Sequence, residues 1–441
     1  MLFDFLKYLQ PTSYFIRSSN SGQSIFPVTD LLSANILKEL EPDQNYQSKQ
    51  AYNYDLSWQA VMKGYIGNKA TYAQIEPLSI HDNYRFIRRY FHPAWVFYVL
   101  ILRIIQFKNP FRELKNWLNT RQVKRVNIGD KFILNTNYKS FDSGLVTEKP
   151  TVSVVIPTLN RYEFLKDVLH DLEVQDYKNF NVIIVDQSDE FNPDFYKSFS
   201  LDICLVRQEE KALWLARNTA IKKSKATFIA LSDDDVRIGS NWISAHLKCL
   251  DFFNARVSAG VFYPQGKEIP KERSFFAIST QFATGNAMLY RNVFKEIGLF
   301  DRQFEKQRMG DGEFGLRVYL QGIKSISNPQ ASCIDIKAET GGLREMGSWD
   351  AFRPSTFFAP RPIPSVLYFF RRYFGNKASR YAMLRTVPIS IFPYQFKKNR
   401  PLLLLGVLVT ILLVPIVLYQ VSKSWKLASK KIEEGPLIET L

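Results

Sequence analysis

Residues 150–350 are predicted to form an α/β domain in which helices flank a mainly parallel β-sheet. The main observation is an alternation of short, unbroken apolar runs with longer amphipathic stretches, the pattern of strands that alternate with helices. The first run, 152–156, is apolar enough for a strand buried on both faces. After it, Leu165, Val168, Leu169 and Leu172 recur at helical spacing, so an amphipathic helix is expected there.

Further elements are expected in the same alternating order. A second buried strand covers 182–185 and ends at Asp186, and a short third strand lies near 203–206. A helix over 212–223 then leads to an apolar strand at 228–231. A later amphipathic helix begins near Asp311 and ends at Gly322.

Polar residues follow the first two strands, where an open parallel sheet binds its ligands. Thr158, Asn160 and Arg161 come after the first strand, and Asp186 ends the second. We therefore expect these side chains on the ligand edge of the sheet. Asp186 taken alone is equally well interpreted as a turn former.

Three consecutive carboxylates, Asp233, Asp234 and Asp235, follow the strand at 228–231. Like charges so close repel one another and are costly to bury, so a compensating positive group is expected. In an extended chain Asp233 and Asp235 point to the same side and can share one site. Oxygen ligands suit a hard cation such as Mg²⁺ or Mn²⁺. The alternative is a solvated acidic loop.

At this point the chain resembles family 2 glycosyltransferases, which have the GT-A fold, a Rossmann-like arrangement. The resemblance rests on motifs that occur in the family's order: PTLNR (157–161), VDQSD (185–189), ALWLARN (212–218), LSDDD (231–235), TGNAMLYR (284–291), EIGLFD (296–301) and GDGEFGLR (310–317). It covers about residues 150–350, under half of the chain. The resemblance implies an inverting transfer of a sugar from a nucleotide sugar.

The resemblance also implies roles for particular residues. The nucleotide-sugar pocket would be formed by Pro157, Thr158, Asn160, Arg161, Asp186, Arg217, Asp233 and Asp234. Arg217 would approach Asp186 or the nucleotide, the alternative being an exposed helix arginine. Asp235 would be the principal metal ligand, with Asp233 beside it. Gly285 and Asn286 would lie below the acceptor and the sugar.

Asp311 matches the family's general base, which takes the proton from the acceptor hydroxyl. Its alternative reading is an ordinary helix N-cap. The family usually has Glu-Asp here, whereas this chain has Gly310-Asp311, and we expect Glu313 to replace the missing acceptor carboxylate.

Many relatives carry a metal-binding histidine after the following strand, and none of the four histidines of this chain lies there. We expect Asp335 to be the third metal ligand in its place. Gly341 and Gly342 then begin a stretch predicted to close over the donor.

The net charge of +16 is divided unevenly along the 441 residues. Residues 1–150 carry +7, residues 151–350 carry −2 and residues 351–441 carry +11. An enzyme of nucleic acids would have basic groups around its chemistry, so no nucleic-acid partner is expected. Basic flanks beside apolar runs instead favour an anionic lipid surface.

The flanks are divided as follows. Residues 1–149 form an accessory region of unknown role with an interfacial helix at 93–107, for which packing against the catalytic domain is the alternative. A basic, aromatic region (351–400) precedes a predicted transmembrane helix at 401–422, which is uncharged and long enough to cross a bilayer. Residues 423–441 form a tail.

The three cysteines form no CxxC pair, and no secretory signal is recognised at the start of the sequence. We therefore expect a cell-membrane protein with its catalytic domain on the cytoplasmic side. Its expected partners are a nucleotide-sugar donor, a glycan or lipid-linked acceptor, and membrane lipid. Transfer to polyprenyl phosphate and a catalytically silent scaffold remain the alternatives.

Overall fold

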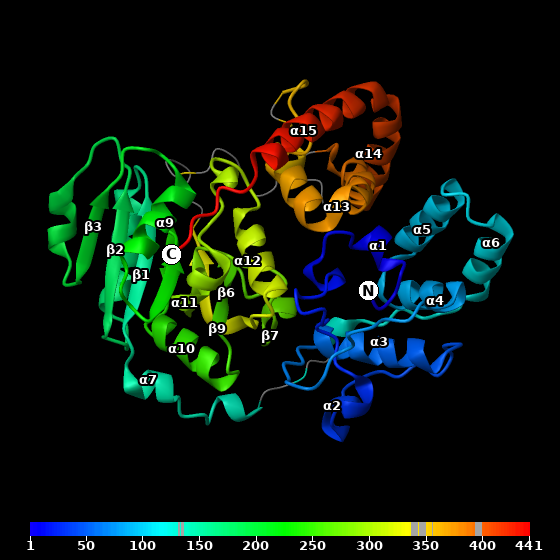
Figure 1. Ribbon diagram of the computed structural model, residues 1–441, viewed down its shortest axis with the longest axis horizontal. Coiled ribbons are helices and arrows are strands. Elements are labelled where there is room, and N and C mark those ends of the chain that lie inside the picture. The colour runs from blue at the N-terminus through cyan, green and yellow to red at the C-terminus, as the bar shows by residue number, and fades with distance from the viewer. Residues whose placement is uncertain (131–132, 134–135, 337–342, 344–349, 355, 393–398) are drawn as a thin grey trace. The chain divides into compact units, whose positions relative to one another are not determined.

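The computed structural model describes the chain except for residues 131–132, 134–135, 337–342, 344–349, 355 and 393–398. The chain forms two compact units (Figure 1). The first contains residues 1–134 and 370–389, and the second contains residues 135–369 and 390–441. The second is here called the catalytic unit because it contains the segment that resembles glycosyltransferases. Residues 370–389 thus belong with the N-terminal region, which the sequence does not indicate.

Among the residues that the structure describes, the catalytic unit contains one nine-stranded sheet. Its strands run in the order β3-β2-β1-β4-β8-β6-β9-β5, and β7 pairs with β9 outside this path. Their bounds are β1 Val152–Thr158, β2 Phe180–Asp186, β3 Ile203–Arg207, β4 Phe228–Ser232, β5 Val236–Ile238, β6 Val257–Pro264, β7 Ala277–Ile278, β8 Asn286–Tyr290 and β9 Ser325–Asp335.

The expectation of a mainly parallel sheet holds for one half of it. β3, β2, β1 and β4 are parallel neighbours, and all seven residues of β1 are buried. Beyond β4 the sheet is mixed, because β8 runs antiparallel to both β4 and β6, whereas β6 and β9 are parallel. The fold is therefore mixed α/β. β1 also continues through Pro157 and Thr158, two residues further than expected.

Helices connect these strands much as the hydrophobic spacing predicts. The stripe of Leu165, Val168, Leu169 and Leu172 is buried on α8, which confirms that helix. The helices of this unit are α7 Gly144–Glu148, α8 Tyr162–Glu173, α9 Leu213–Lys223, α10 Trp242–Phe252, α11 Asn292–Ile297 and α12 Gly310–Leu320, followed later by α14 Arg400–Leu412 and α15 Val414–Glu434.

The first unit is helical. Its helices are α1 Leu6–Leu9, α2 Ala34–Lys38, α3 Lys49–Met62, α4 Ile80–Tyr90, α5 Pro93–Ile105 and α6 Pro110–Asn119. It also takes most of α13 (Pro364–Thr386), which is interrupted at Gly375 with φ 79°. Its core is aromatic, with Phe3 stacked on Phe86 and Tyr381 packed edge-on against Tyr8.

The predicted single transmembrane helix at 401–422 is wrong in its geometry. In the described part of the chain no single helix is both long and apolar enough to cross a bilayer. The apolar run instead forms α14 and the start of α15, which are bent by 87° relative to each other. The break lies at Leu413, two residues before Pro415, whose ring cannot continue a straight helix.

Candidate active site

The carboxyl ends of β1, β2 and β4 bring the predicted residues to one edge of the sheet. Thr158 and Asp186 are register partners at the ends of β1 and β2. β4 ends at Ser232, directly before the acidic triplet. The strand ends therefore place the nucleotide and metal candidates beside one another, as expected for parallel neighbours.

Asp186 is fully buried and organises the turn that follows β2. Its Oδ1 accepts a hydrogen bond from the backbone N–H of Ser188 at 2.8 Å. Its Oδ2 accepts from the hydroxyls of Tyr162 (2.6 Å) and Tyr196 (2.8 Å). This arrangement agrees with its reading as a turn former. The two tyrosines were not found from the sequence.

Asn160 is held in the left-handed region with φ 55°, a conformation that asparagine tolerates better than most residues. Its side chain and Asp189 exchange hydrogen bonds, and its backbone N–H donates to Ser188 Oγ at 2.8 Å. The loops after β1 and β2 are thereby joined into one exposed rim.

Arg161 supplies the positive charge that the acidic triplet requires. Its Nη1 lies 3.1 Å from both Asp234 Oδ1 and Asp235 Oδ2. Asp234 is buried and also accepts from Thr158 Oγ1 at 2.8 Å. Burial raises the pKa of Asp234 to about 6, against the opposing effect of Arg161. Asp234 therefore braces the strand ends from inside, rather than facing a ligand.

Arg217 compensates the first carboxylate of the triplet. It is fully buried on α9, and it pairs with Asp233 and donates to the carbonyl of Ser232. The structure places it at Asp233 instead of Asp186, and the reading as an exposed helix arginine is wrong. A buried guanidinium beside a partly exposed carboxylate fixes where that carboxylate lies.

The segment that begins at Thr284 and Gly285 contacts both the acidic triplet and Asp311. A Cβ on Gly285 would lie 2.2 Å from Asp233 Oδ2, so only glycine allows this approach. Thr284 Oγ1 donates to Asp311 Oδ1 at 2.5 Å. This short segment is therefore in contact with both carboxylates. Gly285 leaves room for Asp233, and Thr284 donates a hydrogen bond to Asp311. Thr284 was missed, although it directly precedes the glycine that the resemblance indicated.

Asn286 anchors this segment in the core. It is fully buried; its Oδ1 accepts from Trp242 Nε1 at 2.8 Å and lies 3.1 Å from His246 Nε2, and its Nδ2 donates to the carbonyl of Ala331. Burial lowers the pKa of His246 to about 4, so this histidine is neutral at pH 7. The polar side-chain atoms of Asn286 are thus used inside the protein, and its expected acceptor contact stays a prediction.

Asp311 lies in the first turn of α12, after Met309, which has φ 85°. Met309 is the N-cap residue and makes no side-chain capping hydrogen bond within the described chain, so the N-cap reading of Asp311 is wrong. Residues in this backbone region cost energy and occur at sites where geometry matters. The aspartate is partly exposed and its orientation is set by Thr284.

Gly310 departs from the family pattern because Trp214 occupies the space. A Cβ at this position would lie 2.3 Å from Trp214 Cζ2. Trp214 is buried at the start of α9. The carboxylate of Glu305 accepts hydrogen bonds there from the backbone N–H groups of Trp214 and Leu215. α9 and α12 thus contact each other where the indole of Trp214 packs against Gly310. Gly310 itself carries no polar group for an acceptor.

Glu313 is paired within its own helix. It is fully buried on α12 and forms a two-pronged ion pair with Arg317, with distances of 2.7 and 3.0 Å. The i, i+4 spacing directs this carboxylate to its own helix, and its expected acceptor contact stays a prediction.

The three predicted metal ligands do not form a ready-made metal centre. Burial raises the pKa of the Cys333 thiol, and the charges of Asp233, Asp335 and Asp235 raise it further. Asp335 is also next to the triplet, since it is the register partner of Val236. Among the described residues, however, no three His, Cys, Asp or Glu side chains are arranged to hold a metal ion. Gly341 and Gly342, the predicted closing loop, lie outside the described residues.

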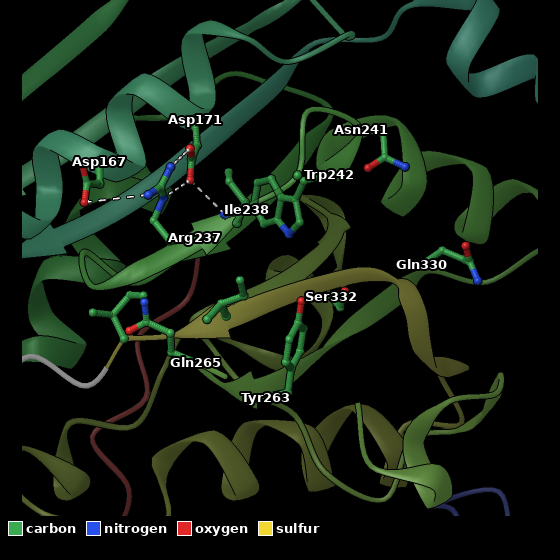
Figure 2. Close-up of a pocket in the computed structure, with 13 residues that line it drawn as sticks. Asp167, Asp171, Arg237, Ile238, Asn241, Trp242, Tyr263, Gln265, Gln330 and Ser332 are labelled. Atoms are coloured by element: carbon green, nitrogen blue, oxygen red, sulfur yellow. Dashed lines mark hydrogen bonds and ion pairs between the residues drawn. The ribbon is translucent and has the colours of Figure 1, made fainter. Parts of the chain in front are cut away.

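A separate pocket of about 600 Å³ lies against β5 and β9, and none of the predicted site residues lines it (Figure 2). Figure 2 shows Arg237 paired with Asp171, with bonds of 2.8 and 2.7 Å, and directed toward Asp167. Tyr263, Gln265, Gln330 and Ser332 complete a largely polar lining. No sequence signal indicated this pocket.

Sequence comparisons identify a glycosyltransferase segment within the catalytic unit. Residues 153–304 match the sequence model of the family described as Glycosyl transferase family 2, and this segment is a domain of that family. The mixed α/β, GT-A-like fold that the resemblance implied is thereby supported.

Two curated relatives are similar to the same part of the chain. Glycosyltransferase GlyA of Streptococcus pneumoniae is 25% identical over 169 residues, 37% of this chain and 23% of that protein. Glycosyltransferase AglE of Haloferax volcanii is 27% identical over 165 residues, 35% of this chain and 53% of that protein. The matched segment thus spans about half or less of these relatives.

Solved structures show a more distant likeness. The mannosyltransferase PcManGT from Pyrobaculum calidifontis, in complex with GDP-Man and Mn²⁺, has a TM-score of 0.44 at 16% identity, over 67% of this chain and 91% of that one. TarS 1–349 of S. aureus, in complex with UDP-GlcNAc, has a TM-score of 0.42 at 15% identity, over 65% and 92%.

Proposed function

We propose that this protein transfers a sugar, with inversion, from a nucleoside-diphosphate sugar to a hydroxyl of a glycan or lipid-linked acceptor. The observation that carries the proposal is the arrangement around residues 284–285. Gly285 allows Asp233 to approach from one side, and Thr284 holds Asp311 on the other. A donor-side carboxylate and a candidate base are thereby kept at a fixed separation on rigid elements.

In this mechanism Asp311 is the general base. The acceptor O–H gives its proton to Asp311 Oδ2, while Thr284 keeps Oδ1 occupied and so fixes the direction of the carboxylate. The acceptor oxygen forms a bond to the anomeric carbon as the bond from that carbon to the phosphate oxygen breaks. The nucleoside diphosphate leaves with the electron pair.

We propose that a divalent cation, Mn²⁺ or Mg²⁺, is held at Asp235 and Asp233 together with the diphosphate. The donor set is suitable in kind, because both side chains are carboxylates. In number it is incomplete, so oxygens from the bound donor would be needed to complete it. A cation held there would stabilise the charge that develops on the leaving diphosphate. Arg161 and Arg217 hold the two carboxylates in place.

The test of the proposed base is Asp311→Asn. This change keeps the shape of the side chain and its bond to Thr284 but removes the basic oxygen, so the rate of transfer should fall by about 10²–10⁴-fold. Nucleotide binding, measured by calorimetry, should stay within about twofold of wild type, since the base contributes to the transition state rather than to ground-state binding. Asp194→Asn, an exposed aspartate in the same unit, is the matched control.

Two outcomes would contradict the proposal. Unchanged transfer in Asp311→Asn would indicate an acceptor that is already ionised, such as polyprenyl phosphate, which needs no base. A purified wild-type protein that neither transfers nor hydrolyses any nucleotide sugar, yet binds one, would indicate a silent scaffold.

We propose that the enzyme meets its acceptor at a membrane surface. One reason is the surface that α5 and α6 present. These helices carry outward apolar side chains, and Phe107 in the turn between them is 97% exposed and Phe111 83% exposed. Lys108, Arg112 and Lys115 are exposed beside them. An amphipathic hairpin with a basic rim is typical of a surface that rests on anionic lipid. We propose that the catalytic unit lies on the cytoplasmic side.

A further inference from the structure

The bend between α14 and α15 exposes a continuous apolar surface, here called the elbow (residues 400–419). Its helices meet at 87° and its outward side chains are large and aliphatic. The exposed members are Leu404, Leu405, Val407, Leu408, Ile411, Leu412, Val414, Leu418 and Tyr419. An apolar surface of this extent on a folded protein marks an interaction site.

One buried arginine holds the chain on both sides of the elbow. Arg361 Nε donates to Gln420 Oε1 at 3.0 Å, after the elbow. Its Nη1 donates to the carbonyl and hydroxyl oxygens of Ser390, before the elbow, at 3.2 and 3.1 Å. The chain therefore leaves the catalytic unit and returns to it at the same guanidinium.

This clamp limits how far the elbow extends from the catalytic unit. α14 has 13 residues, and at about 1.5 Å per residue it is about 20 Å long. The hydrocarbon core of a bilayer is about 30 Å thick.

The rest of α15 and the residues after it stay on the catalytic unit. Lys431 Nζ donates to the carbonyl of Gln303, the backbone N–H of Leu437 donates to Asp301 Oδ1, and the backbone N–H of Leu299 donates to the carbonyl of Glu439. Along α15, Gln420, Ser424 and Ala428 form the buried face.

Lys423, Lys426 and Lys430 are exposed on α15, immediately after the apolar surface. Exposed lysines next to an apolar surface are complementary to anionic lipid headgroups. This charge pattern, joined to the aliphatic surface, favours a lipid leaflet over a protein partner as the occupant of the elbow.

We propose that the elbow inserts into one leaflet of an anionic bilayer and does not cross it, so that the chain enters and leaves the membrane on the face where the catalytic unit lies. The elbow is then a monotopic anchor. Neither the anchor nor its tests depend on sugar transfer, so they stand or fall separately from the proposed function.

The first test measures binding of the full chain to protein-free vesicles made of equal parts phosphatidylcholine and phosphatidylglycerol. Leu412→Ser removes a side chain that is 81% exposed at the bend and should weaken binding by about tenfold. Adding Leu408→Ser and Ile411→Ser should weaken it further, to the level that α5 and α6 alone provide. Val174→Ser, an exposed valine (63%) at the end of α8, is the control and should have no effect. Undiminished binding of the triple variant, or no binding of the wild type, would overturn the proposal.

The second test determines on which side of the membrane each part of the chain lies. Sealed membrane vesicles are prepared separately in each orientation and treated with an impermeant maleimide. Cys204, the exposed natural cysteine, is first replaced by serine. Single cysteines at Asp194→Cys, on the catalytic unit, and Thr440→Cys, beyond α15, then report on the two sides of the elbow. We expect both to be labelled together in one orientation and both protected in the other. Labelling from opposite sides would show a crossing and overturn the proposal.

Discussion

Gly310→Ala tests the contact through which α9 and α12 set the position of Asp311. The new Cβ would lie 2.3 Å from Trp214 Cζ2 and 2.6 Å from Cε2, whereas carbon atoms in contact are about 3.5–4.0 Å apart. The indole or the start of α12 must therefore move by about 1 Å. The indole is rigid, only 3% exposed, and packed at 5.3 Å from the ring of Phe300, so it has little room to yield.

We expect Gly310→Ala to lower the free energy of unfolding by about 1–3 kcal/mol, the usual cost of overpacking a core. Activity should fall as well, because Asp311 is the next residue in α12. A displacement of about 1 Å at the base can reduce kcat/KM by about a hundredfold. Urea unfolding and transfer kinetics measure the two effects.

The matched control is Gly144→Ala. Gly144 is also the first residue of a helix, α7, but a Cβ there would meet its nearest atoms at 3.8 and 3.9 Å, which is ordinary contact. That variant should be neutral or slightly stabilised, since alanine restricts the unfolded chain. In a double-mutant cycle, Trp214→Leu should suppress part of the effect of Gly310→Ala. Wild-type stability and kinetics in Gly310→Ala, or strict additivity with Trp214→Leu, would refute the reasoning.

Three further predictions concern charge. Arg217→Met should destabilise the fold by about 3 kcal/mol in urea, because Asp233 loses its buried partner; a change below the error of the measurement would contradict the ion pair's role. The folded pKa of His246, about 4, is below the unfolded value, so its contribution to stability is full above about pH 6.5 and is lost as the pH falls toward 4. In His246→Gln, stability should therefore fall less steeply over that pH range than in wild type; equal slopes would count against it. Asp235→Asn should abolish any dependence of nucleotide binding on Mn²⁺ in calorimetry, and a retained dependence would place the cation elsewhere.

The parallel half of the sheet could be predicted from the sequence because its strands are buried on both faces. Such strands are continuous apolar runs, and α8 between them has a clear helical stripe. The acidic triplet was found for a similar reason, since three adjacent carboxylates after a buried strand need an unusual environment. The mixed half of the sheet could not be predicted, because most of its strands are short or only partly buried and so are not continuous apolar runs.

Several candidate site residues contact partners that are far away in the chain, and the sequence pattern could not predict those contacts. Asn286 bonds to Trp242, 44 positions earlier, and a spacing pattern carries no information on that contact. Gly310 faces Trp214 for the same reason. Glu313 is different, because its partner Arg317 is one helical turn away, and the i, i+4 pair was available to be read.

The assignment of residues 370–389 to the first unit has a consequence for biosynthesis. Residues 1–134 leave the ribosome first, but Tyr381 and Arg385, which pack on Tyr8 and Trp95, emerge only after residues 135–369. The nascent N-terminal helices therefore remain incompletely covered through the translation of more than two hundred residues. Since domains generally fold as units, both units complete their native packing only near the end of synthesis, the first with residues 370–389 and the catalytic unit with residues 390–441.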